Sequence, residues 1–273
     1  MTGPTGSGKT TTLYSALSQL NKPGIKIITA EDPVEYRLPR VQQVQVNEKI
    51  DLTFTSVLRS ALRQDPDVVL VGEIRDKATS EIALKAAMTG HLVLSSLHTN
   101  DAVSSAVRLI DMGAPAYLVS ASVNGVLAQR LVRKNCEHCA VLYTPTDEEN
   151  AWLISITDGR DFGLESAQFK HGEGCRHCNK TGFFGRIGVY ELLEMTKPLQ
   201  DKLRQGDVSG FAREAYRDHE YETLAMCALR YAIAGTICLQ EVFRLATSLD
   251  DHTMARADDA DSAGTKGSQA AGA

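Results

Sequence analysis

Apolar positions in the first half of the chain follow two spacings. Leu13, Ala16, Leu17 and Leu20 recur at intervals of three and four, which predicts a helix with one buried face. Other apolar runs are continuous, rich in β-branched residues and too short for helices, so they predict buried parallel strands. The predicted strands lie at 25–29, 68–71 and 92–97, and further helices at 56–64 and 79–88. Strands alternating with helices predict a doubly wound α/β core.

The core is predicted to end in two more helices. Asn100 or Asp101 can cap a helix that reaches about residue 112. Pro115 suits the first turn of a longer helix that we expect to end near residue 131.

The second half of the chain changes character twice. Residues 133–190 hold many glycines and four cysteines, with a helix expected at 147–156, so we predict a small metal-stapled module after a core of residues 1–132. Helical spacing returns in 191–249, where Gly235 is a stop signal. Residues 250–273 carry almost no large apolar side chain, and we expect disorder there.

A phosphate-binding loop opens the chain, with the pattern G-x-x-x-x-G-K-[ST] at residues 3–10. Its glycines let backbone N–H groups surround phosphates, Lys9 supplies a positive charge to the β and γ phosphates, and the Thr10 hydroxyl can ligate Mg²⁺. ATP with Mg²⁺ is the expected ligand. The predicted binding residues are Gly3, Pro4, Thr5, Gly6, Ser7, Gly8, Lys9, Thr10 and Thr11.

The position of this loop raises a second expectation. Such a loop normally follows a buried parallel strand, yet only Met1 and Thr2 precede it. We therefore expect the sequence to be truncated and to lack the first strand of the core.

Polar residues with catalytic potential follow the predicted strands. Glu73 ends the second strand and is the candidate general base, although Gly72 occupies the place of the usual Mg²⁺-orienting Asp. His98 ends the third strand and could donate to a γ-phosphate. The alternatives are a solvated strand-end Glu and a structural His.

An acidic cluster follows the first predicted strand. Glu31, Asp32 and Glu35 lie at its carboxyl end, where α/β folds bind ligands, and this suits positioning of Mg²⁺ and water. Acidic residues are also ordinary in loops, so the cluster alone leaves both interpretations open.

Four cysteines form two C-x-x-C pairs, Cys136 with Cys139 and Cys175 with Cys178. Four thiolates can close a tetrahedral Zn²⁺ site, and such a site would be structural because no ligand position stays open. Two disulfides or one redox-active pair are the alternatives. His138 and His177 lie inside the pairs and are expected bystanders.

Composition narrows the classes of function. The chain has 273 residues, of which 43% are hydrophobic, enough to bury a sizeable core. Its net charge of −5 gives no global positive field, which argues against nucleic-acid partners. No apolar run is long enough to span a membrane, so the cytoplasm is the expected compartment.

Together these motifs resemble the secretion and pilus-assembly ATPases, the hexameric motors of type II secretion and type IV pili. The resemblance covers residues 1–249 and rests on the phosphate loop, the acidic box at 31–35, the atypical acidic strand at 70–76 and the histidine box at 89–100. It implies a RecA-like core with an inserted zinc module and a C-terminal helical subdomain.

Within that family the cysteine module and residues 182–191 are similar to assembly motors and unlike retraction motors. Residues 111–115 and 126–133 look most similar to the motor of the mannose-sensitive haemagglutinin pilus. A cyclic-di-GMP-binding region and the arginine fingers are expected in a missing N-terminal region.

The resemblance implies ATP hydrolysis that drives pilin polymerisation or pseudopilus assembly. It further implies a homohexamer on the cytoplasmic face of the bacterial inner membrane, held there through a platform protein. A nucleic-acid translocase or helicase and a non-catalytic nucleotide-binding scaffold are the competing hypotheses.

Overall fold

The computed structural model describes residues 1–246, so the predicted disordered segment 250–273 lies outside the described residues. The chain divides into two compact units. The first comprises Met1–Leu131 and Tyr190–Thr223, and the second Val132–Val189 and the residues from Leu224 onward. Both units are discontinuous in sequence, whereas the sequence analysis expected continuous domains.

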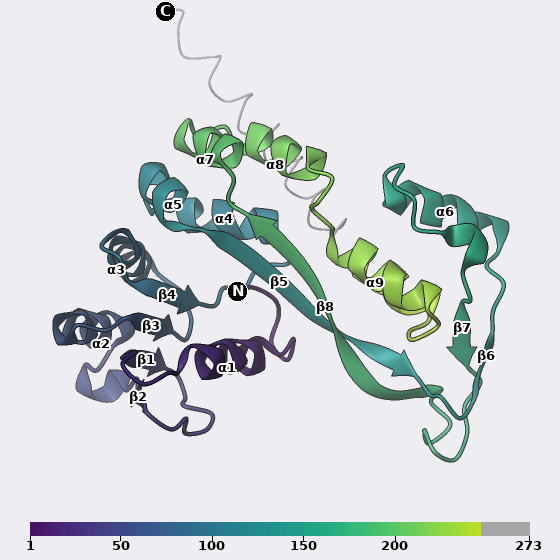
Figure 1. The fold of residues 1–273 in the computed structure, drawn as a ribbon, viewed down its shortest axis with the longest axis horizontal. Helices are drawn as coiled ribbons and strands as arrows, with labels where there is room; N and C mark the ends of the chain where they lie inside the picture. The colour runs from purple at the N-terminus through teal and green to yellow at the C-terminus, as the bar shows by residue number, and fades with distance from the viewer. Residues whose placement is uncertain (247–273) are drawn as a thin grey trace, which may run out of the picture. The chain divides into compact units, whose positions relative to one another are not determined.

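A parallel sheet forms the centre of the first unit (Figure 1). The strand order in the described part of this sheet is β2-β1-β3-β4. Ile27 of β1 is the register partner of Val68 in β3, which in turn is opposite Leu92 in β4. The strands are β1 (Ile27–Glu31), β2 (Val41–Gln45), β3 (Val68–Val71) and β4 (Leu92–Ser95). Predicted strand 68–71 is confirmed, while the first predicted strand lies two residues further along the chain.

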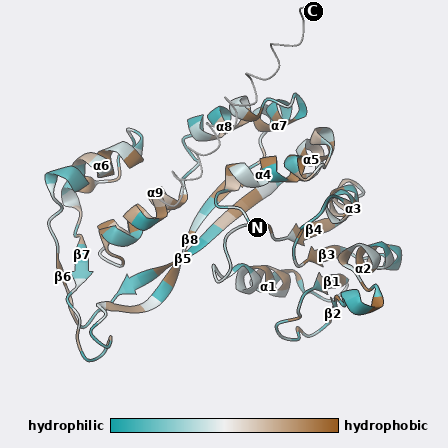
Figure 2. Cartoon of the chain, turned by 180° about the vertical axis from the view of Figure 1, so that it is seen from behind, coloured by the Kyte–Doolittle hydropathy of each residue, from teal (hydrophilic) through white to brown (hydrophobic). Residues whose placement is uncertain are grey.

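Helices cover both faces of this sheet. Successive strand residues point to opposite faces, so Val68 packs with Leu17 of α1, whereas Val69 packs with residues of α2 and α3. All of β3 is buried, as a strand covered on both faces must be. Figure 2 shows the hydrophobic colour on β3 and β4. The helices are α1 (Lys9–Leu20), α2 (Phe54–Ala61) and α3 (Lys77–Met88), with short 3₁₀ turns at η1 (Glu48–Ile50) and η2 (Leu62–Gln64).

Beyond β4 the chain start takes the next place beside the sheet. Thr2 forms parallel bridges to Leu97 and to Ala128, and the Met1 nitrogen donates to the Ser95 carbonyl over 2.7 Å. A cavity of about 470 Å³ adjoins Met1, and its lining includes residues of α1, α3 and β4. The phosphate loop therefore begins between β4 and the strand that carries Ala128.

The segment after α4 departs from its predicted structure. Asp101 caps α4 (Ala102–Asp111) by accepting from the Ser104 N–H, as expected. The long helix predicted to end near residue 131 is wrong, because α5 stops at Ser122 and β5 (Gly125–Asn135) follows. β5 pairs with β8 (Phe183–Glu194). This long-range partner makes the segment a strand, although Pro115 had suggested that a helix continues through it. The bounds of α5 are Ala116–Ser122.

Residues 190–223 join the first unit through a buried carboxylate. Glu191 is 1% exposed and accepts from the Ala102 N–H over 2.7 Å and from the Tyr221 hydroxyl over 2.5 Å. Burial and the Glu191 charge raise the pKa of Tyr221 far above its ordinary value, so Tyr221 stays a donor. The helices of this segment are α7 (Lys197–Arg204) and α8 (Val208–Arg217).

The second unit combines a short antiparallel pair with helices. β6 (Ala140–Leu142) pairs with β7 (Lys170–Gly172), and η3 (Leu164–Ser166) precedes β7. The predicted helix near 147–156 is confirmed as α6 (Asp147–Thr157), which starts with a capping box between Thr146 and Glu149. α9 (Leu224–Ile233) and a helical stretch at 239–246 complete the described part. Among residues 1–246, the helices lack the combination of length and apolarity needed to cross a bilayer.

The α1 packing gives a stability prediction. Leu17 is 0% exposed and lies in the cluster with Val68 and Leu70. Leu17→Ala should lower the free energy of unfolding by about 2–5 kcal/mol, because the lost burial adds to the cost of a cavity. Chemical denaturation measures this loss. The control is Gln19→Ala, an exposed position on the same helix, and an equal effect of both changes would contradict the packing described.

Candidate functional site

The loop at residues 3–10 has the backbone of a phosphate cradle. Its three glycines have positive φ, at 146° for Gly3, 79° for Gly6 and 88° for Gly8. Gly8 is the N-cap residue of α1, so the positive end of this helix faces the loop. Backbone N–H groups at such a helix start bind anions, and Thr10 and Thr11 lie exposed in its first turn.

Lys9 lies across its own loop. Its Nζ donates to the carbonyls of Gly3, over 2.7 Å, and Pro4, over 3.1 Å. Burial lowers the pKa of Lys9, while the charge of Glu73 acts in the opposite direction. The ammonium is therefore held where phosphate oxygens can replace the two carbonyls as its partners.

Gln129 of β5 is a loop contact that the sequence analysis missed. Its Nε2 donates to the Ser7 carbonyl over 2.7 Å, and its Oε1 accepts from the Thr12 hydroxyl over 2.8 Å. The side chain is 3% exposed. Because residues up to 131 were predicted as helix, no sequence signal brought Gln129 to the loop.

Glu73 and His98 lie together beyond the ends of β3 and β4, as the strand order requires. His98 Nε2 is 3.3 Å from Glu73 Oε2, and Arg75 Nη2 is 2.5 Å from Glu73 Oε1. The Glu73 side chain is 12% exposed, whereas those of His98 and Arg75 are open to solvent. A carboxylate with one oxygen near an exposed imidazole and with Lys9 within electrostatic range can take a proton from a bound water.

The acidic box divides into a buried and an exposed part. Glu31 is 3% exposed and accepts from the hydroxyls of Tyr14 and Thr29 and from Gln43 Nε2. Asp32 and Glu35 are exposed. Both Glu31 oxygens are thus held by protein donors, while Asp32 and Glu35 are open to solvent and ions.

Arg130 is a second basic group beside the histidine box. Its Nη2 donates to the carbonyl and to Oδ1 of Asn100, each over 3.0 Å, and its Nη1 is buried without a partner. Burial lowers the pKa of Arg130. The interaction orders the segment that follows His98.

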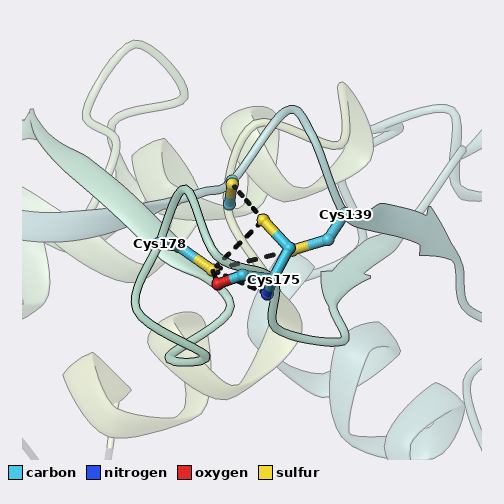
Figure 3. Close-up of side chains that lie close together, drawn as sticks. Cys139, Cys175 and Cys178 are labelled. Carbon is cyan, nitrogen blue, oxygen red and sulfur yellow. Dashed lines mark hydrogen bonds between the residues drawn. The ribbon is translucent and has the colours of Figure 1, made fainter.

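Four thiols converge in the second unit (Figure 3). Cys136 follows β5, Cys139 precedes β6, and Cys175 and Cys178 lie between β7 and β8. All four sulfur atoms lie within 4.8 Å of one another, with separations of 3.8–3.9 Å where sulfur atoms are in contact. Tetrahedral Zn–S bonds of 2.3 Å imply sulfur separations of about 3.8 Å. The cysteines are free thiols, so disulfides do not account for the cluster.

Backbone donors support this cluster. Gly174 N–H donates to Cys139 Sγ, and the N–H groups of Cys175 and Gly182 donate to Cys178 Sγ, over 3.2–3.3 Å. These N–H groups lower the pKa of Cys178 to about 6, whereas burial raises the pKa of Cys139 to about 12. Such a set of thiols favours a cation that stabilises the deprotonated forms. The rings of His138 and His177 contact each other at a tilt of 50°, with centroids 4.2 Å apart, and both lie outside the ligand set found among the described residues.

The sequence matches a known protein family and curated relatives. A family profile described as type II/IV secretion system protein matches residues 1–244. The type II secretion system protein HxcR of Pseudomonas aeruginosa is 44% identical over 245 residues, which are 90% of this chain and 47% of HxcR. The type IV pilus assembly ATPase PilB of Myxococcus xanthus is 43% identical over 89% of this chain and 42% of PilB.

Solved structures show the same fold. The pilus retraction motor PilT with bound ADP superposes with a TM-score of 0.63 at 29% identity, covering 89% of this chain and 59% of PilT. The Legionella pneumophila ATPase DotB gives 0.64 at 22% identity, covering 90% and 59%. The chain spans about half the length of the curated relatives it matches.

The contacts of Glu31 generate a prediction. Tyr14→Phe removes one donor to a buried carboxylate and should lower the free energy of unfolding by about 1.5–3 kcal/mol. Denaturant titration measures the change. Tyr36→Phe is the matched control, because Tyr36 packs edge-on against Tyr14 but is 54% exposed. Equal stabilities of the Tyr14 variant and the parent would contradict the role of this hydrogen bond.

Proposed function

We propose a function for this protein on the basis of its family. The chain belongs to the type II/IV secretion system protein family. Its first unit binds ATP with Mg²⁺ and hydrolyses it to ADP and phosphate. This hydrolysis drives pilin polymerisation or pseudopilus assembly at the bacterial inner membrane. Because the chain spans about half of its relatives, the activity, substrates and partners of the whole protein are part of the proposal.

The observation that carries the proposal is the contact of Glu73 with His98 at one edge of the parallel sheet, with the charge of Lys9 within electrostatic range of Glu73. Phosphates bound at residues 3–11 would draw Lys9 from the Gly3 and Pro4 carbonyls. Glu73 then accepts the proton of a water aligned with the γ-phosphate, and His98 contacts that phosphate. The similarity to PilT, whose structure contains ADP, supports this use of the loop.

The Mg²⁺ ion fits the same edge. The exposed Thr10 hydroxyl would hold the ion, which neutralises phosphate charge when it is bound. Asp32 and Glu35 are the acids that an ion or its waters can reach. Glu31 acts indirectly. Its carboxylate fixes the side chains of Tyr14 and Gln43, which lie beneath the exposed part of the acidic box.

Zn²⁺ fits the four thiols of Cys136, Cys139, Cys175 and Cys178 by their number, softness and spacing. With four protein ligands the ion has no open position, so its role is structural. It fixes the two loops that follow β5 and β7. Loss of the ion should loosen this unit without touching the nucleotide residues.

Membership of the family supports a proposal for the partners. A homohexamer on the cytoplasmic face of the inner membrane would act on a platform protein, with membrane association through that partner. The tetracysteine module favours assembly over retraction, and the similarity to PilB, a pilus assembly ATPase, supports this direction. The motor of the mannose-sensitive haemagglutinin pilus remains our proposal for the subtype.

Two other functions are less well supported. A nucleic-acid translocase needs a positive channel, and the net charge of −5 gives no such field. A non-catalytic scaffold has no need of a nearly buried Glu73 beside an exposed His98. Stimulation of hydrolysis by DNA would favour the first, and ATP binding without turnover the second.

Replacement of the base separates an enzyme from a scaffold. Glu73→Gln should lower ATP hydrolysis by about 10²–10⁴-fold, because the amide cannot accept the proton, while ADP binding is retained. Phosphate release and calorimetry measure the two properties. The control is Glu81→Gln, which removes a partly exposed α3 carboxylate paired with Lys85 and should leave turnover unchanged. Equal rates for the Glu73 variant and the parent would defeat the assignment of the base.

Elemental analysis tests the metal. We expect about one zinc per purified chain, and Cys178→Ser should reduce this content. Cys227→Ser is the control because Cys227 lies outside the thiol cluster. Metal-free protein with intact disulfides would refute the zinc site.

A further inference from the structure

Gln129 forms several hydrogen bonds in and around the phosphate loop, and it has no part in the nucleotide chemistry proposed above. Its backbone N–H donates to the Thr2 carbonyl over 3.0 Å, just before the loop. Its side-chain amide reaches Ser7 inside the loop and Thr12 in α1, just after it. One residue of β5 thus contacts the loop at Ser7 and also the residues that flank the loop on both sides.

Gly3 and Gly8, the first and last glycines of the loop, both lie in close contact with Gln129. A Cβ on Gly3 would come within 2.4 Å of the Gln129 carbonyl oxygen, and one on Gly8 within 2.8 Å of its Nε2. Both glycines also have positive φ, which other residues adopt at a cost. The loop conformation and the place of Gln129 therefore depend on each other.

The chemistry of the contact requires an amide. The Ser7 carbonyl can only accept, so the side chain must present a donor there. The Thr12 hydroxyl then finds the remaining oxygen of the same amide. A carboxylate would face the Ser7 carbonyl with a second acceptor, and an aliphatic side chain would leave both partners unsatisfied in a buried place.

We propose that Gln129 is a positioning residue for the nucleotide phosphates: it holds the phosphate loop in its binding conformation before ligand arrives. Gln129 acts through Ser7 and Thr12 and does not itself touch the phosphates. The proposal rests on the proposed nucleotide-binding function. A loop held in advance loses less conformational entropy when phosphates bind.

Binding of ADP, pyrophosphate and adenosine to residues 1–273 tests this role. Gln129→Leu and Gln129→Glu should weaken ADP and pyrophosphate by about tenfold or more, while adenosine affinity changes little. In turnover, KM for ATP should rise more than kcat falls, because the loop holds substrate and transition state alike. Gln42→Leu, the same change at an exposed β2 position, is the control.

The partner hydroxyl supplies a second test. Thr12→Val keeps the side-chain shape but removes the donor to Gln129 Oε1, so it should weaken ADP binding in the parent. In the Gln129→Leu background the same change should have no further effect, because the two residues act as a unit. Thr12→Ser should restore binding.

The outcomes separate the two proposals. If the parent chain binds neither ADP nor pyrophosphate, the proposed function fails and this role fails with it. If the parent binds both and the Gln129 variants bind them equally well, only the positioning role is overturned. Equal losses for adenosine and pyrophosphate, or additive effects of Thr12 and Gln129, would also overturn it, since a general loss of stability acts in that way.

Discussion

The parallel register of the central sheet is the constraint on which the nucleotide site depends. Ile27, Val68 and Leu92 stand in line across β1, β3 and β4, so these strands end at one edge. The acidic box begins at the last residue of β1, and Glu73 and His98 follow β3 and β4 in the sequence. Burial of β3 between helices on both faces fixes that line, because a shift by one residue would turn its apolar side chains to the wrong helix.

The site balances charge before any phosphate is bound. Lys9 is held on loop carbonyls and within range of Glu73, while Arg75 and His98 contact the same carboxylate. The side chains of Lys9, Arg75 and His98 are partly or largely exposed. An incoming anion can therefore change their contacts without disturbing the buried core. Glu31 differs, because its partners lie inside the protein and keep it fixed.

Local patterns in the sequence were sufficient to predict structure where a single segment determines the conformation. The loop motif, the α4 cap at Asp101, the α6 helix and the two C-x-x-C pairs are short-range features, and each lies where it was expected. The prediction was wrong where pairing is long-range: Pro115 suited the start of a helix that would continue to about residue 131, yet residues from Gly125 onward form β5, which pairs with β8. The contact of Gln129 with the loop was missed for that reason. The interior position of Glu31 likewise depends on Tyr14 and Gln43, residues that no motif connects to it.

β5 has a further consequence through its continuity. Gln129, which holds the phosphate loop, and Cys136, the first thiol of the cluster, are seven residues apart, and β5 includes every residue between Gln129 and Asn135. The covalent path from the phosphate loop contact at Gln129 to the first thiol of the cluster therefore runs through a strand that is paired with β8, and not through a glycine-rich linker.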